Sequence, residues 1–291
     1  MKITLATGEK IEERWSGFEG IAWESVIDGA PFRVERGIAG DHRFVHDASS
    51  RGVHHLSADG GSLSCAPSDP ADPAWWRVVL DSVLFTATLL QGYETLHAGA
   101  IATPDGVVAI TAGTGGGKST LLVALLGRGL ELMADDVLAL ESRGEQAAPL
   151  AHPAPPLMTV PAVMLPILTP DGVPETICTV EDEVWIAVPV HPEPLPLKAL
   201  VLLDRRPMAQ PGEPHASLTK IESPLAILLE SLMRFPDTLE RRRTRFELAS
   251  TLASTIDIWI LRADPDVPPD VLADTLVQGC DLRSFARRSD R

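Results

Sequence analysis

One segment limits the possible folds of this chain more than any other. An apolar run over residues 107–111 leads into a cluster of glycines, and the glycines lead into a lysine followed by two hydroxyl residues. After the apolar run, the residues are Ala112, Gly113, Thr114, Gly115, Gly116, Gly117, Lys118, Ser119 and Thr120. A buried strand that turns through glycines directly into a helix, expected here over residues 119–126, is typical of layered α/β folds. We therefore predict an α/β fold around this segment.

The glycines permit a turn that larger residues would block. Successive backbone N–H groups can surround a phosphate only where no Cβ atoms intervene, and the helix N-terminus adds partial positive charge at the same point. The Lys118 ammonium would reach the β- and γ-phosphates of a nucleotide, and the Ser119 hydroxyl would hold its Mg²⁺. We predict that the residues from Gly113 to Thr120 bind ATP. Ala112 stands where the usual motif has glycine, and alanine is small enough for most such turns.

The scarcity of lysine makes Lys118 unusual. The chain has five lysines, and Lys118 is the only one between residues 11 and 197. An incidental surface charge is therefore a weaker explanation for this position than a functional one.

An acidic pair and a histidine flank the glycine segment. Asp135 and Asp136 interrupt an apolar stretch that we expect to be a strand over residues 132–140. One carboxylate can bind Mg²⁺ while the other orients an attacking hydroxyl, which is the arrangement that phosphoryl transfer requires. His97 lies on an expected strand over residues 96–101, paired with residues 107–111. A lone histidine on an apolar strand is usually a core residue, but beside the acidic pair it could hold Asp135.

These three features together resemble the catalytic domain of HPr kinase/phosphorylase and its smaller relatives in peptide-modification clusters, the lasso-peptide kinases included. The matching residues are Leu96-His97-Ala98-Gly99-Ala100, residues 113–120 and Ala134-Asp135-Asp136. The resemblance implies a P-loop kinase domain of the HPr kinase/PEP carboxykinase type. It also implies ATP- and Mg²⁺-dependent phosphorylation of a serine or threonine hydroxyl on a peptide, protein or small molecule.

The resemblance assigns a role to each side chain of the site. Asp135 is the candidate base, His97 its support, and Lys118 the third catalytic residue; Asp136 and Ser119 are the Mg²⁺ partners. HPr kinase proper carries a Glu-x-x-Arg-Gly-Leu-Gly segment after the acidic pair, and residues 158–164 lack it. This difference argues against HPr as the acceptor and against phosphorylase activity. HPr kinases are hexamers, so the resemblance also allows an oligomer.

Three functions stay open at this point. The first is the kinase, the second is a nucleotide-binding or switch protein without catalysis, and the third is a true HPr kinase that acts on a carrier protein. A transport ATPase or a GTPase fits less well, because the chain has neither a Leu-Ser-Gly-Gly segment nor an Asn-Lys-x-Asp guanine reader.

Turn signals divide the chain into two expected domains. A β-rich N-terminal lobe over residues 1–72 would contain strands at 2–6, 20–26, 31–35 and 43–46. A catalytic domain over residues 73–291 would begin with a buried helix at 75–90. Fifteen of the 25 prolines lie in residues 149–214, which predicts strands and turns rather than helix. Further on we expect strands at 199–204 and 257–262, and helices at 225–234, 238–255 and 270–278.

Charge and hydropathy restrict the partners. The chain has 40 acidic and 25 basic residues, a formal net charge of −15, which argues against nucleic-acid binding. Neither a signal-peptide pattern nor a membrane-length apolar run is present, so we expect a cytoplasmic protein without a membrane partner. The three cysteines are expected to be ordinary thiols.

Two groups of arginines have alternative interpretations. The run from Arg241 to Arg245 is usually the solvated face of a helix, but it could bring an arginine to the transferred phosphoryl group or dock an acidic substrate. Arg205 and Arg206, which follow an expected buried strand, are a second candidate of the same kind.

Overall fold

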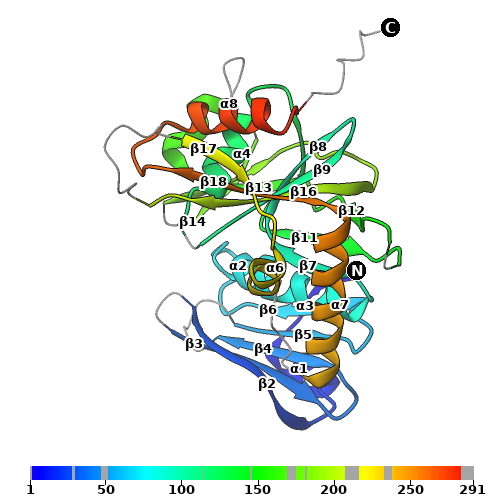
Figure 1. Cartoon of the computed structure of the whole chain (residues 1–291). Coiled ribbons are helices and arrows are strands. Elements are labelled where there is room, and N and C mark those ends of the chain that lie inside the picture. Colours follow the sequence, from blue (N-terminus) through cyan, green and yellow to red (C-terminus); the bar gives the residue numbers. More distant parts are fainter. Residues whose placement is uncertain are drawn as a thin grey trace, which may run out of the picture. The chain divides into compact units, whose positions relative to one another are not determined.

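A computed structural model describes residues 2–27, 30–46, 52–113, 115–144, 146–168, 175–180, 182–206, 216–232 and 238–282 (Figure 1). Its contacts divide the chain into two compact units. The first comprises Met1–Thr95 and Arg234–Thr244, and the second comprises Leu96–Met233 and Arg245–Arg291. The domain boundary after residue 72 stays a prediction. No helix within the described ranges is long and apolar enough to cross a membrane.

The first unit is built on a largely antiparallel sheet with the strand order β1-β6-β5-β4-β3-β2. The strands are β1 (Lys2–Leu5), β2 (Phe18–Ile27), β3 (Ala30–Gly37), β4 (His42–His46), β5 (Val53–Leu56) and β6 (Ser62–Ala66). Alternate residues point to opposite faces of a strand, and Phe32, Phe44 and Leu63 fill the buried face. The predicted strands are confirmed.

One short helix in this unit contradicts the expectation of strands alone. Helix α1 covers Gly8–Arg14, and the side chain of Thr7 caps it by accepting a hydrogen bond from the Lys10 N–H. Ile11 is its one buried residue, so the helix lacks the apolar periodicity by which a sequence reveals amphipathic helices.

The predicted helix over residues 75–90 is confirmed as one continuous helical segment. It consists of α2 (Trp75–Val78), a π-helical turn (Val79–Val83) and α3 (Leu84–Leu90). Apolar side chains along all three parts are buried, Trp75, Val79 and Phe85 among them. This continuous burial explains why the sequence reads as a core helix.

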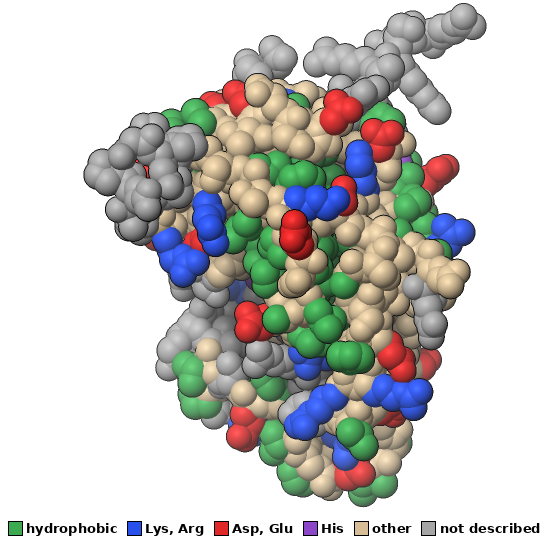
Figure 2. Space-filling model, in the orientation of Figure 1, with side chains coloured by type: hydrophobic (Ala, Val, Ile, Leu, Met, Phe, Trp, Pro, Cys, Tyr) green, Lys and Arg blue, Asp and Glu red, His purple; other side chains and the backbone are tan. Residues whose placement is uncertain are grey.

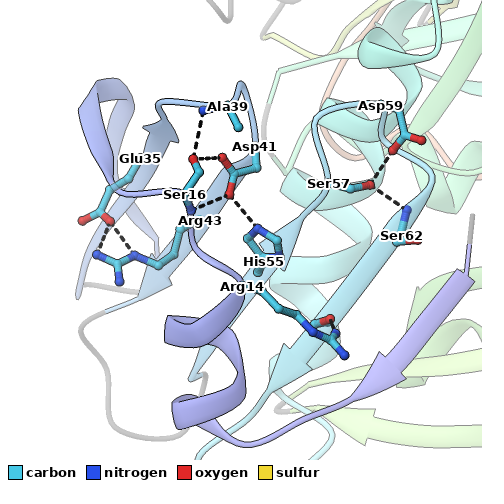
Figure 3. A network of polar contacts seen from close by, with 11 residues as sticks. Arg14, Ser16, Glu35, Ala39, Asp41, Arg43, His55, Ser57, Asp59 and Ser62 are labelled. Atoms are coloured by element: carbon cyan, nitrogen blue, oxygen red, sulfur yellow. Dashed lines mark hydrogen bonds and ion pairs between the residues drawn. The ribbon is translucent and has the colours of Figure 1, made fainter.

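A polar network joins three parts of the first unit: the segment before β2, the turn between β3 and β4, and strand β5 (Figure 3). The Asp41 carboxylate accepts hydrogen bonds from the Ser16 hydroxyl and backbone N–H, and it lies 2.8 Å from His55 Nε2. Burial raises the pKa of Asp41, but the hydrogen bonds from Ser16 and His55 outweigh it and hold the pKa below the ordinary 3.8. Asp41 therefore stays ionised and joins the segment before β2 to β5.

The second unit is organised around a mixed sheet with the strand order β10-β8-β9-β16-β12-β11-β7, with β18 beside β16 and β17 beside β18. Its strands are β7 (Glu94–His97), β8 (Gly99–Thr103), β9 (Gly106–Ala112), β10 (Glu131–Ala134), β11 (Val137–Glu141), β12 (Leu150–His152), β16 (Leu195–Asp204), β17 (Ala216–Lys220) and β18 (Asp257–Ala263). Strands β9, β16 and β18 are parallel, so their carboxyl ends meet at one edge.

Helices cover both faces of this sheet. Alternate residues of β9 belong to different cores: Val108 and Ile110 pack with α4 (Lys118–Leu126) and α8 (Pro269–Gly279), whereas Val107 and Ala109 pack with α6 (Leu225–Ser231) and the later part of α7 (Leu239–Thr255). Because both faces are buried, the central strands are continuous apolar runs. The strands predicted at 107–111, 199–204 and 257–262 are confirmed, as are the helices predicted after residue 118, although α6 ends at Ser231. The expected strand over residues 96–101 is wrong as one strand, because it is interrupted between β7 and β8. Only β8 pairs with β9, and His97 lies on β7, which is next to β11.

A small antiparallel sheet completes the second unit. Strand β15 (Glu183–Ala187) lies between β13 (Leu157–Pro161) and β14 (Thr176–Val180), and a 3₁₀ turn (Ala162–Met164) and α5 (Leu165–Leu168) follow β13. The proline-rich segment is thus mainly strands and turns, as predicted.

Candidate functional site

A glycine-rich turn links β9 to α4 at the carboxyl edge of the parallel strands. Gly115 and Gly117 have φ angles of +70° and +90°, which only glycine adopts without strain. The Gly116 N–H donates to the Gly113 carbonyl at 2.8 Å, and the Leu121 N–H donates to the Gly117 carbonyl at 2.9 Å as the helix begins. Thr114, a predicted ligand, lies outside the described residues.

Gly116 has the least space of the loop glycines. A Cβ atom there would lie 2.8 Å from the Gly113 carbonyl oxygen and 2.9 Å from the Ala112 Cβ. The Gly113 carbonyl and the Ala112 side chain together therefore leave no room for a side chain at position 116. Gly113 is exposed and has no atom within 4 Å of such a Cβ.

Lys118, the first residue of α4, is buried, with 8% of its surface exposed. Its ammonium group forms a short ion pair with the Asp136 carboxylate and lies 4.0 Å from an Asp135 oxygen. A buried lysine is costly unless it is paired, and this one lies between two carboxylates at the head of a helix. The structure thus brings together the lysine and the acidic pair that the sequence singled out.

The two aspartates form a sharp turn, which corrects the expected continuous strand over residues 132–140. Strand β10 ends at Ala134 and β11 begins at Val137; Asp136 has a φ of +65°, a conformation that aspartate tolerates better than most residues. The Val137 N–H donates to the Asp135 carbonyl at 2.8 Å. An apolar pattern on both sides of the pair concealed this turn.

Asp135 is held from a second direction. Its side chain is 4% exposed, and Oδ2 accepts a hydrogen bond from the Thr159 backbone N–H at 2.9 Å. Thr159 belongs to β13, the segment that stands in place of the Glu-x-x-Arg-Gly-Leu-Gly signature. Sequence reasoning missed this contact, because a backbone donor leaves no signal in the residue type.

His97 lies beside Asp136 at the end of β7. The Ala98 N–H donates to the Asp136 carbonyl at 3.1 Å, which fixes the acidic turn next to the histidine. Desolvation by the surrounding protein lowers the pKa of His97, although the residue keeps solvent access, and the nearby Lys118 charge lowers it further. The charge of Asp136 and a hydrogen bond to its backbone act in the opposite direction. The imidazole is therefore neutral at pH 7, and its support of Asp135 stays a prediction.

The side chains present fit a nucleotide-bound Mg²⁺. Ser119 and Thr120 follow Lys118 on the first turn of α4 and are partly exposed, and the Asp136 side chain is 37% exposed. Hydroxyl and carboxylate oxygens are the ligands that Mg²⁺ prefers, usually together with phosphate oxygens and water. Among the described residues, no group of three or more His, Cys, Asp or Glu side chains is arranged to hold a metal by itself.

The first and the last arginine of the run from Arg241 to Arg245 have structural partners. Arg241 forms an ion pair with Glu94, and the two side chains are 16% and 14% exposed. Arg245 is buried and donates to the Leu229 carbonyl at 2.7 Å. The run is therefore not simply a solvated helix face, and a role of its members at a phosphoryl group stays a prediction.

Comparisons with known proteins give a distant similarity to solved structures and none to known families or curated sequences. No model of a known protein family matches the chain, and no curated protein sequence matches it either. Among solved structures, the Hpr(Ser) kinase/phosphatase from Coxiella burnetii is 17% identical, with a TM-score of 0.33; the match covers 65% of this chain and 90% of that one.

Proposed function

We propose that this protein is an ATP-dependent kinase that transfers the γ-phosphate to a serine- or threonine-type hydroxyl. Its acceptor would be a peptide, a protein or a small molecule, with modification of a peptide natural product such as a lasso peptide as the leading case. The proposal rests on the described site and on the resemblance of its sequence motifs to HPr-kinase-like proteins.

The observation that carries the proposal is the position of Lys118. A buried ammonium group at the head of α4 follows directly on a glycine turn and contacts two carboxylates that belong to a separate turn. A purely structural loop has no need for a buried lysine in this place. A phosphate-binding loop needs it to neutralise the charge of the transferred group.

Each residue has a distinct task in the proposed reaction. The backbone of the glycine turn and Lys118 would bind the phosphates, and Ser119 with Asp136 would hold Mg²⁺, which neutralises charge on the phosphate oxygens. Asp135 would accept a hydrogen bond from the acceptor hydroxyl and orient it toward the γ-phosphorus. A carboxylate with an ordinary pKa near 4 is a weak base, but the transition state is loose, so orientation matters more than basicity.

Phosphorylation can be tested directly. The protein is incubated with Mg²⁺, ATP and peptides encoded by neighbouring genes, and mass spectrometry detects the addition of a phosphate. We expect phosphorylation by the wild type. The rate of phosphorylation should fall about 10²-fold or more in Lys118→Ala and Asp135→Asn, as it does when other preorganised polar groups of an active site are removed.

Lys198→Ala is the matched control. Lys198 lies on β16 and pairs with Asp105 at 3.6 Å, outside the glycine turn, so its loss should leave the rate unchanged. Equal product formation by the wild type and Lys118→Ala would contradict the proposal. Tight ATP binding without transfer to any hydroxyl would instead favour the nucleotide-binding or switch function.

A further inference from the structure

Arg205 lies directly beside the glycine turn. It follows β16, whose Leu203 is paired with Ala112, the last residue of β9. A Cβ atom on Gly117 would lie 3.4 Å from Arg205 Cδ and 3.5 Å from its Nη1. The arginine side chain therefore lies on the side of Gly117 from which a side chain would project, within contact distance of a Cβ atom placed there.

One end of the guanidinium group is firmly anchored. Nη2 donates hydrogen bonds to the carbonyls of Asp264, Pro265 and Val267, the first at 3.4 Å and the last at 2.8 Å. These carbonyls belong to the segment after β18, the other parallel neighbour of β16. The anchor fixes the arginine at the carboxyl edge of the sheet, where α/β proteins bind their ligands.

The other two nitrogens of the guanidinium group are Nε and Nη1. Nε is buried and has no hydrogen-bond partner among the described residues, and Nη1 faces Gly117. A buried donor without a partner is costly, so Nε is available to a further acceptor beyond the described residues. Arg206 differs, because its Nε and Nη2 both donate to the Asp204 carboxylate and its side chain is 78% exposed.

We propose that Arg205 binds the phosphate chain of the nucleotide through its Nη1 and Nε edge, with Nη2 anchoring the group in place. This inference rests on the proposed kinase function and extends the phosphate site beyond Lys118 to the neighbouring strand. A preorganised guanidinium group suits phosphate oxygens, because its planar donors match their geometry.

Nucleotide affinity tests the inference. Calorimetry measures Mg·ATP binding to the wild type, Arg205→Met and Arg206→Met, and ligand-observed NMR titrations measure AMP binding. We expect Arg205→Met to weaken Mg·ATP binding about 10- to 100-fold, as expected for a lost charged hydrogen bond, and to affect AMP much less. Arg206→Met should bind Mg·ATP within about threefold of the wild type, because Arg206 already pairs with Asp204.

A purely structural role gives different results. If Arg205 only anchors the carbonyls after β18, Arg205→Met lowers the unfolding temperature and weakens ATP and AMP binding equally, which would overturn the inference, as would unchanged ATP binding. If Arg205→Met does not fold, Arg205→Lys takes its place, because lysine retains the charge but not the planar donors of the guanidinium group. A ratio of ATP to AMP affinity in Arg205→Lys equal to that of the wild type would also overturn the inference.

The two proposals fail in different ways. If the wild type phosphorylates its acceptor and Arg205→Met binds ATP with normal affinity, only the proposed role of Arg205 is wrong. A wild type that binds no Mg·ATP removes the kinase function, and the role of Arg205 with it.

Discussion

At the scale of single residues, the glycine turn gives its glycines unequal space. A Cβ atom at position 116 would lie 2.8 Å from the Gly113 carbonyl oxygen and 2.9 Å from the Ala112 Cβ. Gly116 must therefore remain glycine, although its φ angle is not positive. Gly113, three residues earlier in the same turn, has open space around it.

This difference predicts that two glycine-to-alanine substitutions affect the stability of the protein differently. Gly116→Ala should lower the free energy of unfolding by about 1–3 kcal/mol, the usual cost of overpacking, because backbone and a short side chain must move. Gly113→Ala should leave the stability of the nucleotide-free protein unchanged. Urea denaturation of both variants measures the difference, and equal stability would show that the turn is loosely packed.

Most of the candidate site could be predicted from residue types, and the rest could not for a physical reason. Lys118, Asp135 and Asp136 were predicted as a group, and the structure places them in contact. The donor to Asp135 was missed because it is the backbone of Thr159. Arg205 was predicted only as one of several candidate arginines, because the pairing of β16 with β9, which brings it to the turn, cannot be read from residue types.

At the scale of elements, the sequence predicted individual strands better than their interruptions. Residues 132–140 read as one strand because the residues on both sides of Asp135 and Asp136 are apolar. The break requires a positive φ at Asp136, which the residue type permits but does not demand. Helix α1 was missed for the related reason that it buries a single residue.

The polar network of the first unit supports a prediction about how its elements are held together. Asn at position 41 has only one acceptor oxygen in place of the carboxylate, so Asp41→Asn should lower the free energy of unfolding at pH 7 by about 1–3 kcal/mol. Because the folded-state pKa of Asp41 lies below its unfolded value, its contribution is present above about pH 4 and is lost as the pH falls through the folded value.

The difference between Asp41→Asn and the wild type should accordingly shrink between pH 7 and pH 3. Urea denaturation at the two pH values measures it. Asp59→Asn is the matched control. Asp59 is exposed and accepts hydrogen bonds from the nearby Ser57 hydroxyl and Gly61 N–H, so its substitution should lower the free energy of unfolding less than Asp41→Asn does. Figure 3 shows Asp59 beside Ser57. A difference that is constant with pH would mean that the ionised carboxylate of Asp41 is not what stabilises the network.

At the scale of the whole molecule, the acidic composition poses a problem for a protein that is to bind an anionic nucleotide. The formal net charge is −15, and on the face drawn in Figure 2 neither Lys and Arg nor Asp and Glu side chains form one continuous patch. At the carboxyl edge of the parallel strands, the basic residues Lys118, Arg205, Arg206 and Arg262 lie among the acidic residues Asp135, Asp136, Asp204, Asp264 and Asp266. The basic residues do not outnumber the acidic ones there, so the electrostatic attraction of a nucleotide is confined to short range.

This charge distribution predicts how salt affects nucleotide binding. Outside the site, the net negative charge of the protein repels Mg·ATP. At about 0.15 M salt, this repulsion is screened over a distance of roughly 8 Å. The association rate of Mg·ATP should therefore rise about two- to fivefold between 10 mM and 150 mM salt, whereas a basic, electrostatically steered site would show a fall. Stopped-flow measurements with a fluorescent ATP analogue give the rate, and the uncharged adenosine analogue should show no change. A falling rate for the ATP analogue would mean that the cations at the glycine turn attract the nucleotide from far outside the site.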